Sequence, residues 1–172
     1  GAVSTLGEGK QIPAEVVAKV PDAQVMSDLD AAVAWAGRYQ GNTARLGITG
    51  FGWGGRTVWL YAAHNPALKA GVAWYGPVDR AYHGGSSLTP LAVADKIKAP
   101  MLGLYGGADA GISNESVDRI QAALKAAGNT RSQIVTYADT PHAFHADYRP
   151  TYRKQQAAEA WKRMLEWFGK HL

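Results

Sequence analysis

Apolar residues recur along the chain with two spacings, one helical and one extended, and the two alternate. The helical spacing is clearest after Asp22, at Val25, Met26, Leu29, Ala32, Val33, Trp35 and Ala36. An amphipathic helix is therefore predicted there, ending near Gly41 and Asn42. The same reasoning, with Pro and Gly as start and stop signals, predicts helices at 16–20, 55–64, 90–97, 113–127 and 152–171.

Short apolar runs bounded by turn residues lie between these helices. They predict strands at 45–49, 69–75, 100–105 and 133–137. Strands that alternate with helices of this length favour a parallel α/β sheet covered on both faces. In such sheets the working residues lie just beyond the carboxyl ends of the strands. Gly52, Asp109 and His142 each follow a different predicted strand, so we expect them to form one site.

The turn after the first strand reads Gly50-Phe51-Gly52-Trp53-Gly54-Gly55-Arg56. This pattern is that of a nucleophile elbow, G-x-nucleophile-x-G, in which the reactive residue lies at the tip of a tight strand-to-helix turn. Gly52 occupies the tip and has no side chain that could attack a substrate. The tip of such a turn usually has positive φ, where glycine is unstrained, so Gly52 should stabilise the turn.

The three strand ends together fit acyl transfer. Such a site needs a nucleophile, an imidazole that moves the proton, and a carboxylate that orients the imidazole. The order here is the nucleophile position Gly52, then Asp109, then His142, as in hydrolases of this architecture. The backbone N–H of Trp53, which follows the tip, would face a developing oxyanion.

Other interpretations of the same residues stay open. The glycine-rich turn could bind a phosphate at a helix N-terminus, but Trp74-Tyr75-Gly76-Pro77 supplies no acidic residue after the second strand. Asp109 alone could be a turn residue. His142 and His145 are three residues apart, yet no further ligand at helical spacing completes a metal site, and we expect neither metal nor cofactor.

Composition narrows the classes of function. The 172 residues suffice for one domain, contain no cysteine, and carry a net charge of +4 from scattered basic residues. The densest basic group lies on the last helix among Glu159 and Glu166, which favours a solvated face over a nucleic-acid interface. No apolar run is long enough to span a membrane and no targeting segment is visible, so a cytoplasmic protein is expected, with a processed or exported form left open.

Several motifs resemble those of the dienelactone hydrolase family. The elbow, residues 50–56, is similar to that family's G-F-C-W-G-G-R, whose nucleophile is a cysteine. Tyr105-Gly106-Gly107-Ala108-Asp109 resembles its acid-bearing strand end, and Pro141-His142-Ala143-Phe144 its histidine loop. The likeness runs from about Val20 to the C-terminus. It implies an α/β-hydrolase fold, a three-layer αβα arrangement, and hydrolysis of an enol-lactone or small carboxylic ester by a Cys-His-Asp triad, with no cofactor.

Two departures from the family pattern change the expectation for this chain. Gly52 stands where the family has cysteine, so this chain is expected to be inactive as written. Ser86, Ser87 and Ser113 do not lie in an elbow and are not expected to replace the cysteine. Nothing in residues 1–19 supplies the strands that precede this region in the family. We therefore expect the single domain, residues 1–172, to be the C-terminal part of a longer protein, or to meet the missing part as another segment.

Substrate contacts are assigned on the chemistry of a carboxylate-bearing lactone, which would need an arginine near the site. Arg149, seven residues after His142, is the candidate, and a surface ion pair with Asp147 is its alternative. Phe51, Trp53, Tyr75 and Tyr82 could line an apolar pocket or belong to the core. The rival to a hydrolase is a catalytically dead relative that acts as a small-molecule binding or interaction protein.

Overall fold

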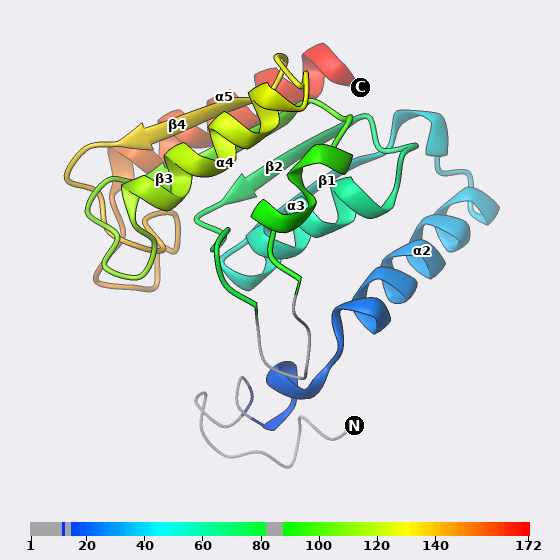
Figure 1. The fold of residues 1–172 in the computed structure, drawn as a ribbon, viewed down its shortest axis with the longest axis horizontal. Coiled ribbons are helices and arrows are strands. Elements are labelled where there is room, and N and C mark those ends of the chain that lie inside the picture. Colours follow the sequence, from blue (N-terminus) through cyan, green and yellow to red (C-terminus); the bar gives the residue numbers. More distant parts are fainter. Residues whose placement is uncertain (1–11, 13–14, 82–87) are drawn as a thin grey trace.

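The computed structural model describes residues 12, 15–81 and 88–172, and its centre is a four-stranded sheet (Figure 1). The strands are β1 (Gly47–Phe51), β2 (Ala70–Trp74), β3 (Met101–Gly106) and β4 (Gln133–Tyr137). They lie side by side in the order β1-β2-β3-β4, and every neighbouring pair is parallel. The predicted parallel sheet is confirmed, and its strands all point their carboxyl ends to the same edge.

Helices cover both faces of the sheet, as a three-layer arrangement requires. The connections α3 (Trp53–His64), η4 (Leu91–Lys96) and α4 (Asn114–Ala126) lie on one face, and α5 (Lys154–His171) packs on the other (Figure 1). Successive crossovers between adjacent parallel strands fall on one face because they share the same hand. Side chains of β2 and β3 are buried between these layers, among them Val72, Trp74, Leu102 and Leu104.

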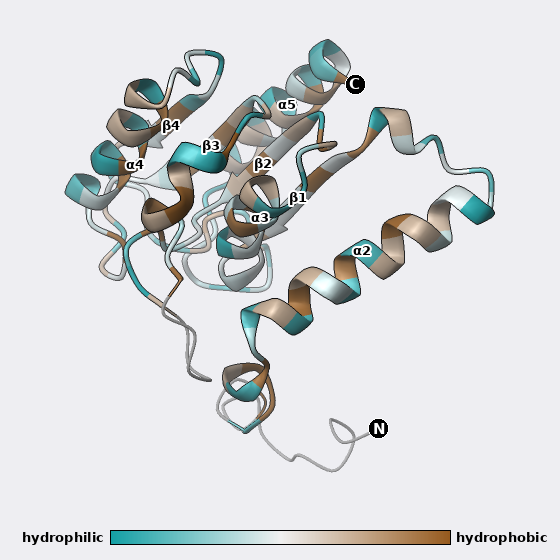
Figure 2. Ribbon diagram, turned by 45° about the vertical axis from the view of Figure 1, so that its right-hand side comes forward, coloured by the Kyte–Doolittle hydropathy of each residue, from teal (hydrophilic) through white to brown (hydrophobic). Residues whose placement is uncertain are grey.

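The first helix, α2 (Asp22–Arg38), lies to one side of the body beyond α3 (Figures 1 and 2). It follows the short helix η2 (Val17–Lys19). Its first residue, Asp22, is buried and receives two hydrogen bonds from Arg56 of α3. Trp35 and Tyr39, by contrast, are exposed and stack on each other. The helix is thus attached to the elbow region through its N-terminal end.

The first strand begins and ends two residues later than predicted, at Gly47–Phe51 rather than 45–49. Residues 43–45 form the short helix η3 (Thr43–Arg45), with the Asn42 side chain accepting from Ala44 N. Gly50 and Phe51 are paired with Ala73 and Trp74, so the strand continues into the glycine-rich segment. The end of β1 is thus set by its pairing with β2, which the pattern of apolar residues within 45–51 does not reveal.

The spacing of apolar residues in the last helix predicts one buried face made of Ala157, Ala160, Trp161, Met164, Leu165 and Phe168, and this prediction is partly wrong. Ala157, Ala160 and Met164 are buried as expected, but Trp161 is 44% exposed and Leu165 is 55% exposed. Within the described part of the chain β1 pairs only with β2, so its outer edge bears no neighbouring strand. Four strands with the elbow strand first predict such an unpaired edge, and the described residues show it. No helix in residues 12, 15–81 and 88–172 has the length and apolarity needed to cross a membrane.

Candidate active site

The elbow is built by backbone geometry at Gly52. This residue has φ 55° and ψ −116°, directly between the end of β1 and the first residue of α3. Its N–H donates to Trp74 O at 2.9 Å, and its own carbonyl accepts from Arg56 N at 3.0 Å. A Cβ placed on Gly52 would meet no atom within 4 Å outside its chain neighbours. The tip therefore has room for a side chain, and only its positive φ disfavours one.

Gly50 is required for a different reason, the close approach of the two arms of the turn. A Cβ on Gly50 would lie 2.5 Å from Gly54 O, a backbone atom that cannot move aside. Gly54 has open space at the same test. Of the two glycines that flank Gly52 in the motif, Gly50 is therefore required by steric crowding and Gly54 is not.

Asp109 lies three residues after the end of β3, and its side chain is only 1% exposed. Its Oδ1 accepts from the backbone N–H groups of Gly111 and Ile112, at 2.8 and 3.1 Å. Burial acts to raise the pKa of Asp109, but the hydrogen bond from His142 and those two N–H groups outweigh it and hold the pKa below its usual value. The carboxylate is thus ionised and fixed in place.

His142 lies in the loop after β4 and contacts Asp109. Its Nδ1 is 2.6 Å from Asp109 Oδ2, and its side chain is 43% exposed. Because Asp109 accepts at Nδ1, the proton belongs on that nitrogen and Nε2 is left to act as a base. The ring of Tyr75 meets the imidazole edge-on, with centroids 5.1 Å apart. Tyr75 itself has φ 37°, an uncommon backbone conformation for a bulky residue, directly after β2.

One cavity of about 450 Å³ joins these groups at the carboxyl edge of the sheet. Gly52, Trp53, Asp109 and His142 all line it. The remaining lining residues come from the loops after β2, β3 and β4: Pro77, Arg80, Ala108, Ala110, Gly111, Ile112, Pro141 and Thr151. The structure therefore brings together the residues that the sequence placed in one site. It adds Arg80, which sequence reasoning missed although Arg80 follows β2 at the same sheet edge.

The N–H of Trp53 points from the first turn of α3, where backbone N–H groups have no partner within the helix. Among the described residues, no backbone hydrogen bond of the turns, loops and caps uses it, whereas the preceding N–H of Gly52 donates to Trp74 O. This donor and the positive end of the helix dipole both favour a developing negative charge beside Gly52. Trp53 lines the same cavity as Gly52 and His142, and its oxyanion role stays a prediction.

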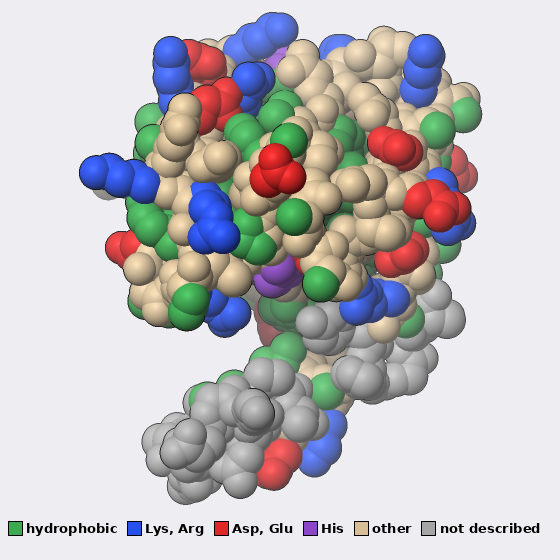
Figure 3. Space-filling model, turned by 90° about the vertical axis from the view of Figure 1, so that its left-hand side faces the viewer, with side chains coloured by type: hydrophobic (Ala, Val, Ile, Leu, Met, Phe, Trp, Pro, Cys, Tyr) green, Lys and Arg blue, Asp and Glu red, His purple; other side chains and the backbone are tan. Residues whose placement is uncertain are grey.

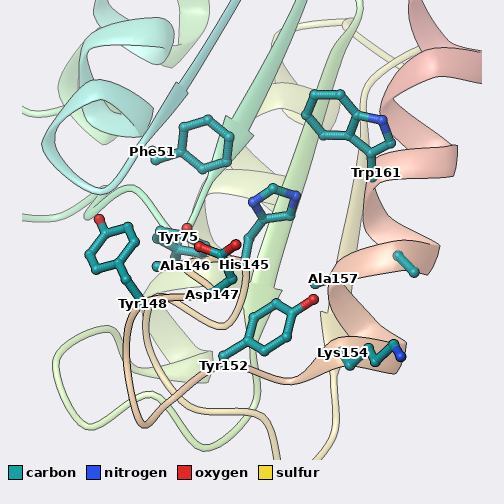
Figure 4. A pocket seen from close by; sticks show the side chains of 11 residues that line it. Phe51, Tyr75, His145, Ala146, Asp147, Tyr148, Tyr152, Lys154, Ala157 and Trp161 are labelled. Carbon is teal, nitrogen blue, oxygen red and sulfur yellow. The ribbon is translucent and has the colours of Figure 1, made fainter.

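Phe51 and Tyr75 line a second, larger cavity of about 770 Å³ between the end of β1 and α5 (Figure 4). Phe51 is 41% exposed, whereas Tyr75 is buried, and burial raises the pKa of Tyr75 to about 12. His145 stacks between Phe51 and Trp161, with centroids 5.4 and 5.5 Å away. Burial lowers the pKa of His145, which favours the neutral ring between these aromatic faces.

The remaining substrate candidates are placed differently. Arg149 is exposed and lies beside the ring of Tyr148, with its guanidinium carbon 5.7 Å from the ring centroid, and it lines neither of the two cavities. The structure shows no ion pair between Arg149 and Asp147, two described residues. Tyr82, Ser86 and Ser87 lie outside the described residues. Ser113 caps α4, its Oγ accepting from Ser116 N at 3.1 Å.

The elbow helix is tied to the strand ends by a buried hydrogen-bond chain. Trp59 Nε1 of α3 donates to the hydroxyl of Tyr105 at 3.0 Å, and that hydroxyl donates to Gly76 O at 3.0 Å. Tyr105 lies in β3 and Gly76 follows β2, so the chain links three elements at the carboxyl edge. These two hydrogen bonds fix α3, β3 and the segment after β2 relative to one another beneath the site.

Charge on this side of the molecule is mixed. Figure 3 views the side toward which the strand arrows of Figure 1 point, and basic and acidic side chains are interspersed over it. A surface that binds nucleic acid would carry a continuous basic patch.

A parallel sheet between helices, a glycine-tipped elbow and an Asp–His pair at the strand ends define an α/β-hydrolase. A sequence model of the dienelactone hydrolase family matches residues 4–172, and the chain belongs to that family. A crystal structure of a provisionally named dienelactone hydrolase from Klebsiella pneumoniae superposes with a TM-score of 0.91 at 47% identity, covering 98% of this chain and 70% of that one.

Two relatives provisionally named as carboxymethylenebutenolidases are similar in sequence. The protein of Methylorubrum extorquens is 59% identical over 175 residues, which are 99% of this chain and 59% of the relative. The Escherichia coli K12 protein is 53% identical over 156 residues, 91% of this chain and 57% of the relative. The chain thus spans somewhat more than half the length of these relatives.

Proposed function

We propose that the site hydrolyses an enol-lactone or a small carboxylic ester, with position 52 as the nucleophile position, His142 as the base and Asp109 as its partner. The single observation that supports this most is the 2.6 Å contact between Asp109 and His142, in a cavity that both share with Gly52 and Trp53. The names given to the two relatives agree with a lactone substrate.

The proposed reaction needs a thiol at position 52. His142 Nε2 takes the thiol proton, and the thiolate attacks the carbonyl carbon while the carbonyl oxygen becomes an oxyanion beside Trp53 N–H. Collapse of this intermediate breaks the ester C–O bond, and the leaving oxygen receives the proton from His142. Water then attacks the acyl-thioester and gives its proton to His142. The thioester C–S bond then breaks, the carboxylic acid leaves, and the sulfur takes the proton back from His142, which restores thiol and base.

Gly52 removes the first step of this sequence. The main-chain turn, the base His142 and the oxyanion donor Trp53 N–H remain, but position 52 has no side-chain atom that could form the acyl-enzyme. We therefore expect no turnover of dienelactone or nitrophenyl esters by the chain as written. Gly52 also favours the second candidate function, a binding protein that keeps the cavity and has lost the chemistry.

In the described part of the chain, β1 has a neighbouring strand on one side only, and this suggests what the domain contacts in the whole protein. Phe51, Trp161 and Leu165 are exposed near that edge or on the helix beside it. Bare strand edges with apolar neighbours favour pairing with a further strand. The relatives are longer than the matched region, and we propose that the rest of the whole protein supplies such a strand.

The test is hydrolysis of an enol-lactone and of 4-nitrophenyl acetate by the chain and by Gly52→Cys, the latter also placed in the whole protein. We expect no hydrolysis above buffer by the chain and clear hydrolysis by the variant. Folded Gly52→Cys protein that stays inactive in both settings, while the unsubstituted chain still binds the lactone, would instead favour the binding role.

A further inference from the structure

The cavity that contains the Asp109–His142 pair also contains a permanent cation. Arg80 lines it from the loop after β2, on the same edge of the sheet as Gly52. Apart from Asp109, Arg80 and the imidazole, the lining side chains are apolar, small or uncharged. The only carboxylate in the lining is Asp109, which is already bonded to His142 and to two backbone N–H groups. Among the charged side chains of this lining, Arg80 is thus the one that makes no ion pair with a described residue.

The Arg80 side chain has donors to spare. It hydrogen-bonds the carbonyl of Gly111 through one nitrogen. A guanidinium carries five N–H donors in a planar fork that suits a carboxylate. None of the ion pairs found among the described residues involves Arg80. An anionic ligand in the cavity could therefore bind this side chain without displacing a protein carboxylate.

The position of Arg80 is set by a buried ion pair that starts at the elbow. Arg56, four residues after Gly52, is fully buried and binds Asp22 through two nitrogens, at 2.7 and 2.8 Å. Its Nε donates to Arg80 O at 3.4 Å, and Nη2 also donates to Leu88 O at 2.7 Å. One guanidinium thus holds the backbone on which Arg80 stands next to the first turn of α3.

We propose that Arg80 is the specificity-determining residue that binds a carboxylate on the substrate, and that Arg56 is a positioning residue for it. The proposal rests on the proposed hydrolase function and assigns the anion contact to Arg80 in place of Arg149. Both side chains are exposed, but Arg149 lies outside the cavity lining, whereas Arg80 shares the cavity with Gly52 and His142.

The experiment compares a matched pair of esters, 4-acetoxybenzoate and its neutral methyl ester, as substrates of Gly52→Cys. The ratio of kcat/KM for the anionic ester to kcat/KM for the neutral ester measures the preference for the anion. The two esters have different leaving groups, but this difference is the same for every variant and cancels when the ratios of two variants are compared. In that background Arg80→Met should lower the ratio about tenfold, the effect of losing one charge-assisted contact at a partly exposed site. The larger part of this change should come from the kcat/KM of the anionic ester, whose carboxylate loses its partner.

Arg131→Met is the matched control. Arg131 also makes one hydrogen bond to a backbone carbonyl, that of Lys98, on an exposed surface, but it lines neither cavity of the site. It should leave the ratio unchanged. A ratio that is unaffected by Arg80→Met, or that falls with Arg149→Met instead, would overturn the proposal.

Arg56→Lys tests the positioning role, because lysine keeps a cation for Asp22 but loses the fork that reaches Arg80 O and Leu88 O. We expect the ratio to fall, because only the anionic ester uses the Arg80 side chain that Arg56 positions. A merely structural role would lower both substrates equally and would contradict the assignment of Arg56.

Binding separates this proposal from the hydrolase proposal. The unsubstituted chain should bind 4-hydroxybenzoate about tenfold more tightly than methyl 4-hydroxybenzoate, and Arg80→Met should abolish the difference. If Gly52→Cys hydrolyses neither ester, the hydrolase proposal fails while this binding preference still decides the role of Arg80. Equal or undetectable binding of both compounds would overturn the Arg80 assignment alone.

Discussion

The two halves of the site are built to different degrees. On one side, Asp109 and His142 form a 2.6 Å pair whose carboxylate is further held by two backbone N–H groups. On the other side, the elbow has the backbone of a nucleophile turn, with Gly52 at φ 55°, but no reactive atom. The acid–base half is complete in side chains, whereas the nucleophile half is complete only in main chain.

This difference shows that the turn does not depend on its nucleophile. The elbow is held by the Gly52 N–H bond to Trp74 O, by the close packing of Gly50 on Gly54, and by the buried Arg56–Asp22 pair. None of these contacts involves a side chain at position 52. The scaffold can therefore persist when the reactive residue is lost, and it can receive that residue again.

The largest expected effect concerns the complete half. In the Gly52→Cys background, Asp109→Asn should lower kcat for ester hydrolysis by about 10³-fold, because the imidazole loses its orienting carboxylate. Asp118→Asn, at an exposed position of α4, is the control and should have no effect. Steady-state kinetics with 4-nitrophenyl acetate measures both. Equal rates for the two variants would show that the Asp109–His142 pair is not used.

Gly50→Ala should weaken the incomplete half most. Its Cβ would lie 2.5 Å from Gly54 O, so the turn must open, and the free energy of unfolding should fall by about 3 kcal/mol. Gly54→Ala meets open space in the first turn of α3 and should be neutral or stabilising by about 0.5 kcal/mol. Urea unfolding distinguishes the two. Similar losses for both would contradict the close approach at Gly50.

Gly52→Ala isolates the strain at the tip. No atom would contact the new Cβ, so the cost comes only from a side chain at φ 55° and should be about 1 kcal/mol in the free energy of unfolding. The same urea series measures it. A loss as large as that of Gly50→Ala would mean that the tip is crowded.

The smallest effect is on pH dependence. Burial lowers the pKa of His145, so the unfolded chain binds a proton there more readily than the folded one. The stability from this residue is present above its unfolded pKa of about 6.5 and is lost as pH falls through the folded value. His145→Phe should therefore reduce the loss of unfolding free energy between about pH 7 and pH 5, by less than about 1 kcal/mol. The free energy of unfolding, measured with urea at several pH values, checks this. The same pH dependence in His145→Phe and in the unsubstituted chain would contradict it.

Much of the fold could be predicted because the alternation of strands and helices is local. Strand β4 has the predicted bounds, α4 begins and ends within one residue of its predicted bounds, and the residues after three predicted strands line one cavity. The start of β1 could not be predicted, since pairing with β2 sets it. The spacing of Trp161 and Leu165 fits a buried helix face, but both side chains are exposed. The position of β1 at the edge of the described sheet is likewise visible only in three dimensions.

The site shows the same division. Gly52, Asp109, His142 and Trp53 follow from motif and chain order, and the structure places them on one cavity. The arginine does not follow from them. Closeness in sequence to His142 favoured Arg149, whereas the loop that reaches the cavity is the one after β2, which carries Arg80. A loop's path over the strand ends depends on tertiary contacts such as Arg56 with Arg80 O, which no local pattern reveals.

The most direct measurement is the pH dependence of alkylation of the thiol introduced by Gly52→Cys, with and without His142→Ala. It needs no substrate and reports only on the contact between position 52 and the base. We expect iodoacetamide to react well below the ordinary thiol pKa of about 8.5, and this advantage to disappear with His142→Ala. Alkylation that follows an ordinary thiol in both proteins would contradict the claim that the Asp109–His142 pair is placed to activate a nucleophile at this position.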